Sequence, residues 1–359
     1  MKRDISLLAT AVGSLPYNNP KEALNLIFSN IGNFPVWPQL SHVNQKEDML
    51  AQFTQNIPGI VFDEEDNRWY MDQNEENFYE QLEEFYLDYE SIINDKNFEL
   101  LDKYAISGEF SSPIPLFFEK IKEVKPVAIK GQITGPFTWG TSLVDREKKC
   151  AFYDETLREI IIKGLTLKAL WQVVKFKEYS PNSIPVIFLD EPSMSQYGAS
   201  TFITITKEDI TSSISEIATV LKDNGALVGI HCCGKTDWSL ITSSNVDILN
   251  FDALNFAESL SLYSRELEKF MQNGGYIAWG MVPTLDEDVL KVANIDFLMD
   301  KFQTALAYLT NKGIDEKLIL DSSFITPTCG AGSLSIELAV KALNLTSELS
   351  RAIREKYKG

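Results

Sequence analysis

Cysteine and histidine are scarce in this chain, which has four cysteines and two histidines in 359 residues. Four cysteines in so long a sequence are too few for the dense disulfide framework of a small secreted domain, so we expect reduced thiols. A reduced cysteine close to a histidine is a candidate metal ligand or nucleophile. These few side chains are therefore the first candidates for metal binding or catalysis.

Positive charge is also scarce, because 33 lysines and arginines stand against 51 aspartates and glutamates and the formal net charge is −18. An acidic surface repels phosphate backbones and anionic lipids, which argues against nucleic-acid and membrane partners. No apolar run approaches the roughly 18 residues of a membrane-spanning helix. The first ten residues hold two basic side chains and only a short, broken apolar stretch, unlike a signal peptide. We expect a cytoplasmic protein.

Short β-branched runs alternate with longer segments of helical periodicity, which is typical of repeated βα units and a parallel sheet. Eight such units favour a closed (β/α)8 TIM barrel, formed by residues 1–359 as a single catalytic domain. About ninety residues, 15–104, separate the first two predicted strands and form a helical insertion. We expect a helix with a solvated acidic face over 78–93, rather than a lid or docking surface. The predicted strands are 7–13, 105–110, 127–134, 185–191, 226–233, 247–252, 276–282 and 318–324.

The fifth predicted strand ends in Gly-Ile-His-Cys-Cys-Gly. Because side chains alternate along a strand, His231 and Cys233 share one side and Cys232 takes the other. Cys329 follows the eighth predicted strand, and the ends of barrel strands share one rim. Imidazole and thiolate are ligands that zinc prefers, and a catalytic site keeps one position open. The sequence thus predicts a zinc site made by His231, Cys233 and Cys329.

Three further residues have simpler interpretations. We expect Cys150 and Cys232 to be structural, since neither faces the same point. Asp252 ends the sixth predicted strand and is a fourth candidate zinc ligand; the alternative, a carboxylate that caps the next helix, is equally consistent with the sequence.

A site with two thiolates favours one kind of chemistry. Zinc deprotonates a coordinated substrate thiol, and two thiolate ligands leave that sulfur nucleophilic. Water activation for hydrolysis usually relies on histidines and carboxylates instead. We therefore expect an enzyme that activates a small thiol.

These motifs resemble the catalytic half of cobalamin-independent methionine synthase and, more broadly, the superfamily of methylcobamide:thiol methyltransferases and uroporphyrinogen decarboxylases. The resemblance implies zinc ligands at His231, Cys233, Asp252 and Cys329, although the family has glutamate where this chain has Asp252. It also implies homocysteine as the substrate. Its carboxylate would contact Val12, Gly13 and Ser14, its amino group would contact Asp190 in the Asp190-Glu191-Pro192 motif, and residues 130–136 match the family's K-G-x-L-T-G-P run.

One departure bears on the methyl donor. The synthases carry a histidine after strand seven, and residues 279–284 contain none. A folate nitrogen that leaves from the methyl group needs a proton, whereas Co(I) of a corrinoid does not. We therefore favour a methylcorrinoid (methylcobalamin), carried by a corrinoid protein, over methyl-folate as the donor.

The sequence as a whole predicts a zinc-dependent methyltransferase that transfers a methyl group to a thiol, with Asp190, His231, Cys233 and Cys329 as the catalytic group and Val12, Gly13, Ser14, Asp190 and Glu191 as the substrate site. One alternative is a decarboxylase of the uroporphyrinogen type, which an acidic chain fits poorly because its substrate carries many carboxylates. The other is a non-catalytic zinc- or corrinoid-binding partner.

Overall fold

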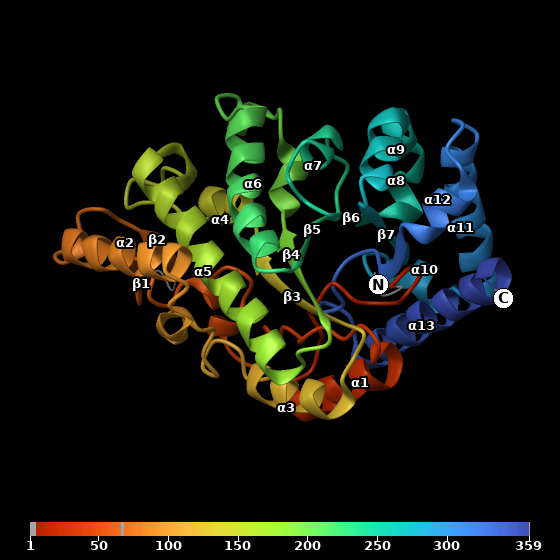
Figure 1. Ribbon diagram of the computed structural model, residues 1–359, viewed down its shortest axis with the longest axis horizontal. Coiled ribbons are helices and arrows are strands. Elements are labelled where there is room, and N and C mark those ends of the chain that lie inside the picture. Colours follow the sequence, from red (N-terminus) through yellow and green to blue (C-terminus); the bar gives the residue numbers. More distant parts are fainter. Residues whose placement is uncertain (1–4, 66–67, 359) are drawn as a thin grey trace.

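A parallel sheet of six strands lies at the centre of the computed structural model, which describes residues 5–65 and 68–358 (Figure 1). The strands pair in chain order. Nearly every strand residue is buried, as expected of a parallel sheet covered on both faces. The strands are β3 (Ala128–Thr134), β4 (Ile184–Asp190), β5 (Leu227–Cys232), β6 (Ile248–Asp252), β7 (Tyr276–Val282) and β8 (Ser323–Pro327).

Helices connect these strands and cover the outside of the sheet. They begin with the expected signals: the side chain of Asp154 caps α5, and Thr206 and Asp209 form a capping box on α6. Apart from α2, the helices are α1 (Pro20–Ile31), α3 (Ile114–Val124), α4 (Pro136–Ser142), α5 (Glu155–Tyr179), α6 (Lys207–Asp223), α7 (Ser239–Thr242), α8 (Ala253–Leu260), α9 (Ser264–Gln272), α10 (Glu287–Val292), α11 (Ile295–Thr310), α12 (Glu316–Asp321) and α13 (Ile336–Lys358). Short 3₁₀ helices span Gln45–Glu47, Ala51–Phe53, Phe98–Tyr104, Ala151–Tyr153, Pro192–Gln196, Ser200–Phe202 and Ser261–Tyr263.

Two irregular extended segments lie along the edges of the sheet. Residues 7–14 run parallel to β8, where Ala9 pairs with Ile325. Residues 34–39 run parallel to β3, where Val36 pairs with Lys130. The two segments also meet each other, because the amides of Leu15 and Gln39 donate to the carbonyls of Gln39 and Gly13. The structure thus confirms a parallel α/β sheet, and isolated bridges at residues 7–14 and 34–39 extend its two edges.

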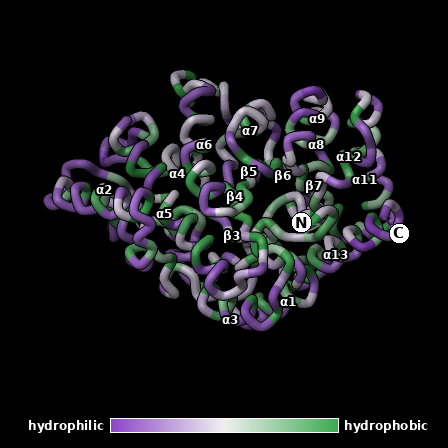
Figure 2. The backbone as a smooth tube through the Cα atoms, in the orientation of Figure 1, coloured by the Kyte–Doolittle hydropathy of each residue, from purple (hydrophilic) through white to green (hydrophobic). Residues whose placement is uncertain are grey.

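The inner face of the sheet changes from apolar to polar along the strands. At the amino ends, side chains from all six strands form an apolar cluster with Phe34, with Leu227 of β5 packed at its side, and the ring centroids of Phe34 and Phe324 are 5.4 Å apart. Figure 2 shows hydrophobic residues concentrated along these central strands. Further along, Lys130, Asn250 and Asp190 take the inward positions, two or four residues beyond members of that cluster. Polar side chains therefore collect at the carboxyl ends of the strands.

The prediction of a second strand at 105–110 is wrong, because these residues form no strand in the structure. These residues follow a 3₁₀ helix (Phe98–Tyr104) and end in a turn, and Ile106 and Phe110 are buried in the core. An apolar run in an irregular buried segment has the same sequence pattern as a short strand. Residues 34–39 lie beside β3 instead. The sequence does not predict an extended segment there, because Pro35 and Pro38 are unusual within a strand.

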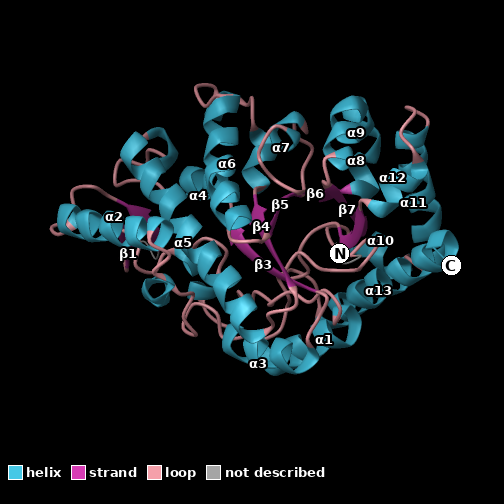
Figure 3. Ribbon diagram, in the orientation of Figure 1, coloured by secondary structure: helices cyan, strands magenta, loops and turns pink. Residues whose placement is uncertain are grey.

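The long connection therefore follows residue 39 instead of residue 14. It contains an antiparallel hairpin, β1 (Ile60–Asp63) with β2 (Arg68–Met71), and helix α2 (Phe78–Asn94). Figure 3 shows the hairpin and α2 together at one end of the molecule. The predicted helix over 78–93 is confirmed, and it buries Phe78, Phe85, Tyr89 and Ile92 while its glutamates are exposed.

The eighth predicted strand, 318–324, is displaced. The apolar residues 318–320 belong to α12, because Asp315 caps a helix there by accepting the Leu318 amide. Strand β8 begins only at Ser323. None of the helices described is long and apolar enough to cross a bilayer. Residues 1–4 of the stretch considered as a signal peptide lie outside the described residues.

Candidate metal centre

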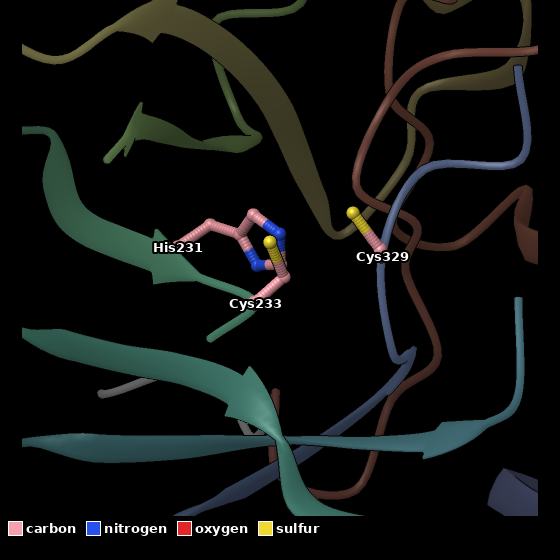
Figure 4. A group of neighbouring side chains, drawn as sticks. All are labelled: His231, Cys233 and Cys329. Atoms are coloured by element: carbon pink, nitrogen blue, oxygen red, sulfur yellow. The ribbon is translucent and has the colours of Figure 1, made fainter. Parts of the chain in front are cut away.

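The structure brings His231, Cys233 and Cys329 together, with their ligand atoms all within 4.8 Å of one another. His231 lies in β5, Cys233 is the first residue after the end of β5, and Cys329 lies two residues beyond β8. Figure 4 shows the first two side chains projecting from the end of β5 and Cys329 approaching from the opposite side. One nitrogen and two sulfurs thus converge from two distant parts of the sequence.

The tautomer of His231 follows from its neighbour on β6. His231 Nδ1 lies 2.6 Å from Asn250 Oδ1, and the two residues pair directly across the strands. The Asn250 amide nitrogen donates to the carbonyl of Ala278 at 2.8 Å and to Thr326 Oγ1 at 2.9 Å, which fixes the amide oxygen as the acceptor. Nδ1 therefore carries the hydrogen of the neutral ring, and the lone pair of Nε2 is available.

That available nitrogen suits a metal ligand. His231 is buried, and its Nε2 has no hydrogen-bond partner among the described residues. A buried nitrogen without a partner is costly unless something coordinates it. Metal-ligating histidines characteristically donate their other ring N–H to an oxygen, as His231 does to Asn250. The donor set of one imidazole and two sulfurs fits zinc with one position left open.

The two cysteines differ in charge. Cys329 and His231 lower the pKa of Cys233 to about 4, so this thiol is ionised at neutral pH. The same interaction with Cys233, together with burial, raises the pKa of Cys329. The pair therefore holds one proton in the absence of a cation, and a divalent cation would displace it.

Cys232 points away from this group, as the alternation of side chains predicts. It is fully buried, its Sγ lies 3.5 Å from the carbonyl of Gly234, and burial raises its pKa to about 12. It is a neutral core thiol. Cys150 also lies outside the group, and its backbone forms an isolated antiparallel bridge with Val144.

Asp252 is not a member of the group within 4.8 Å. Both of its oxygens accept hydrogen bonds from Asn255, one from the backbone amide at 3.1 Å and one from the side chain at 2.7 Å. The carboxylate thus caps α8, as the alternative interpretation proposed. Coordination of a metal by Asp252 stays a prediction and would require this cap to open.

Asp190 and Ser14 lie close to the metal ligands. Asp190 pairs with His231 across β4 and β5, is buried, and has an Oδ1 without a partner among the described residues. Burial raises the pKa of Asp190, against the charge of Lys130. Ser14 Oγ accepts the Gly332 amide at 3.2 Å, and a side chain at position 330 would overlap its hydroxyl.

Glu191, a predicted substrate contact, bonds to the beginning of α4. It is fully buried, and its oxygens accept the amides of Phe137 and Thr138 at 2.9 and 2.7 Å and the hydroxyl of Thr138 at 2.6 Å. Burial raises its pKa to about 7 in spite of these bonds. Glu191 thus holds the beginning of α4, and its contact with a substrate stays a prediction.

Two residues at this end of the sheet were missing from the predicted site. Lys130 is fully buried, and its Nζ donates to the carbonyl of Val12 at 2.6 Å, which ties the segment with Gly13 and Ser14 to β3. Burial lowers its pKa to about 8. His42 Nε2 lies 2.8 Å from the carbonyl of Gly332. The K-G-x-L-T-G-P run was the signal for Lys130, and the rarity of histidine was the signal for His42.

The fold and this group define an α/β protein with a TIM-barrel-like sheet and a candidate imidazole–thiolate metal centre at the carboxyl ends of its strands. No protein-family model matches the chain. The chain is 27% identical over 255 residues to the methionine synthase of Methanocaldococcus jannaschii. The aligned region covers 68% of this chain and 74% of that protein. A solved B12-independent methionine synthase from Shewanella sp. W3-18-1, in complex with selenomethionine, has a similar fold, with a TM-score of 0.58, 13% identity and 98% coverage of both chains. The chain therefore resembles a methionine synthase in sequence and a B12-independent methionine synthase in fold, as the motifs predicted.

Proposed function

We propose that this chain is a zinc-dependent methyltransferase that methylates the thiol of homocysteine to form methionine, with its active site at the rim of a single (β/α)8 barrel. The segments 7–14 and 34–39 would take the first two strand positions of that barrel. The observation that carries the proposal is the buried Nε2 of His231, which has no hydrogen-bond partner within residues 5–65 and 68–358 and lies beside the sulfurs of Cys233 and Cys329. The names of the sequence relative and the solved neighbour support methionine synthesis.

Each residue has a distinct task in this proposal. Zinc held by His231, Cys233 and Cys329 would lower the pKa of an incoming thiol, which makes its sulfur a nucleophile at neutral pH. Asp190 Oδ1, which has no partner among the described residues, would accept the ammonium group of the amino acid. Ser14 Oγ already accepts the Gly332 amide, so its own hydrogen is free for the carboxylate.

The thiolate pair also bears on localisation. One ionised and one protonated thiol in contact are readily oxidised to a disulfide, so the site needs a reducing compartment whenever the metal is absent. This supports the cytoplasm as the place where the enzyme works.

We propose methyl-folate as the donor, in place of the methylcorrinoid favoured on sequence alone. The solved neighbour is B12-independent, and neither comparison supports a corrinoid protein as a partner. The argument for a corrinoid depended on the missing histidine after β7. Another histidine, His42, contacts the loop that follows Cys329, which removes that objection.

Two measurements test the proposed function. Elemental analysis of the purified protein should find about one zinc per chain. The same sample should methylate homocysteine when supplied with methyl-folate or with methylcobalamin, assayed separately. Bound zinc without methylation from either donor would indicate a non-catalytic zinc protein.

A further inference from the structure

We propose that His42 is the general acid that protonates the leaving nitrogen of the methyl donor. The inference rests on the proposed function and adds a catalytic residue to it. His42 and His231 are the two histidines of the chain, and the proposed metal centre uses only His231. His42 lies in neither the predicted site nor the group of metal ligands.

The position of His42 follows from the direction of residues 34–39. This segment runs parallel to β3, so its end at Gln39 lies at the same rim as the ends of β5 and β8. His42 comes three residues later. Its ring reaches across to Gly332, in the loop that begins with Cys329, where Nε2 lies 2.8 Å from the carbonyl.

The same loop also holds the proposed amino-acid site. The carbonyl of Gly332 contacts His42, while its amide donates to Ser14 Oγ at 3.2 Å. Gly332 follows Cys329 by only three residues. One short backbone segment therefore links a metal ligand, a substrate-binding hydroxyl and the second imidazole, and it fixes their relative positions.

The contact with Gly332 leaves one ring nitrogen of His42 available. A carbonyl oxygen only accepts, so Nε2 carries a hydrogen, and Nδ1 has no hydrogen-bond partner among the described residues. His42 is exposed, whereas Lys130 and Glu191 are buried and engaged with backbone groups. An imidazole with one nitrogen anchored and the other open can release a proton to a bound molecule and regain it from water.

In the proposed step one carbon–sulfur bond forms and one carbon–nitrogen bond breaks. The lone pair of the homocysteine sulfur, whose proton has gone to solvent, forms a bond to the methyl carbon. The bond between that carbon and the folate nitrogen breaks, and its electron pair stays on the nitrogen. The imidazolium of His42 gives its Nδ1 proton to that nitrogen and becomes neutral. The products are methionine and the demethylated folate.

Two variants separate proton donation from the anchoring contact. His42→Gln keeps an N–H that can donate to the Gly332 carbonyl but does not titrate, and His42→Ala loses both functions. With methyl-folate and homocysteine, both variants should turn over at least about 100-fold more slowly than the wild type. With methylcobalamin, whose cobalt leaves without a proton, His42→Gln should retain wild-type turnover and wild-type zinc content.

The outcomes distinguish this inference from the proposed function. Full activity of His42→Gln with methyl-folate, or equal losses with both donors, would overturn the role of His42 and leave the methyltransferase intact. A wild type that uses methylcobalamin but not methyl-folate would do the same. A zinc-loaded wild type that uses neither donor would overturn the proposed function, and the role of His42 with it.

Discussion

His231 donates its Nδ1 hydrogen to Asn250 Oδ1 at 2.6 Å, from directly paired positions on β5 and β6. Because this bond selects the tautomer, the lone pair of Nε2 is directed toward the two cysteines before any metal arrives. The preparation of the site thus depends on a residue that would never contact the metal.

Asn250→Leu should therefore weaken zinc binding by about 10- to 100-fold, because the imidazole loses the acceptor that fixes its tautomer and orientation. A competition titration against a chelator measures the change. Asn250→Asp is the matched control, because it keeps an oxygen for Nδ1 while losing the amide bonds to Ala278 and Thr326. Wild-type zinc affinity in Asn250→Leu would show that the tautomer is set by something else.

Substitutions of Cys232, Cys233 and Cys329 test directly which cysteines bind the metal. Cys233→Ala and Cys329→Ala should each lose bound zinc and thiol methylation, since two protein ligands hold zinc poorly. Cys232→Ala should retain both and lose only about 1 kcal/mol of stability from a small cavity. Zinc content and methyl transfer are measured on the same preparations. Loss of zinc from Cys232→Ala alone would mean that the opposite face of β5 binds the metal.

Removal of the metal should expose a reactive thiolate. At pH 7 the metal-free protein should be alkylated by iodoacetamide first at Cys233, whose pKa is lowered to about 4. Cys232 should react last, because it is fully buried and its pKa is raised to about 12. Peptide mass mapping after short exposure gives the order. Zinc should protect Cys233, and unchanged alkylation after zinc is restored would contradict its role as a ligand.

Asp190→Asn should raise the KM for homocysteine by about 100-fold, because the neutral amide no longer pairs with the ammonium group. Zinc content should stay at the wild-type level. A thiol that has the carboxylate but lacks the amino group should be methylated equally by the wild type and the variant. A variant that also loses zinc would instead make Asp190 part of the support of the metal.

Stability should depend on pH through Lys168, which is buried on α5 and donates to the carbonyls of Gln55 at 2.7 Å and Tyr104 at 3.3 Å. Burial lowers its pKa to about 7, whereas an unfolded lysine keeps its proton until about pH 10. Between these values the unfolded state binds more protons, so this contribution to the free energy of unfolding rises with pH above 7 and is flat below it.

Urea unfolding of the wild type and Lys168→Met between pH 7 and 9 measures this contribution. Other buried groups affect both proteins, so the difference between the two slopes isolates Lys168. The wild type should gain more stability over this range than Lys168→Met. Equal slopes would mean that Lys168 keeps its proton inside the folded protein.

The sequence determined those parts of the protein that follow from a local period. Alternation along β5 placed His231 and Cys233 on one side and Cys232 on the other. The βα rhythm predicted eight parallel strands whose ends share a rim, and six of them form the sheet, the last one displaced along the chain. Family motifs added Ser14 and Asp190 as proposed substrate contacts, and the prediction of a methyltransferase agrees with both comparisons. Each of these conclusions follows either from residues that are close in the chain or from the rule that the carboxyl ends of barrel strands meet at one rim.

The tertiary structure decided what depends on a partner distant in sequence. A carboxylate such as Glu191 can bind a substrate or hold the amides of α4, and only the position of α4 chooses between them. Residues 34–39 lack a strand pattern because of their prolines, and only their bridge to β3 reveals where they lie. His42 and Gly332 are separated by 290 positions, and Asn250 reaches His231 from another strand. Hydrogen bonds over such separations leave no periodic trace in a sequence, because folding alone brings their two ends together.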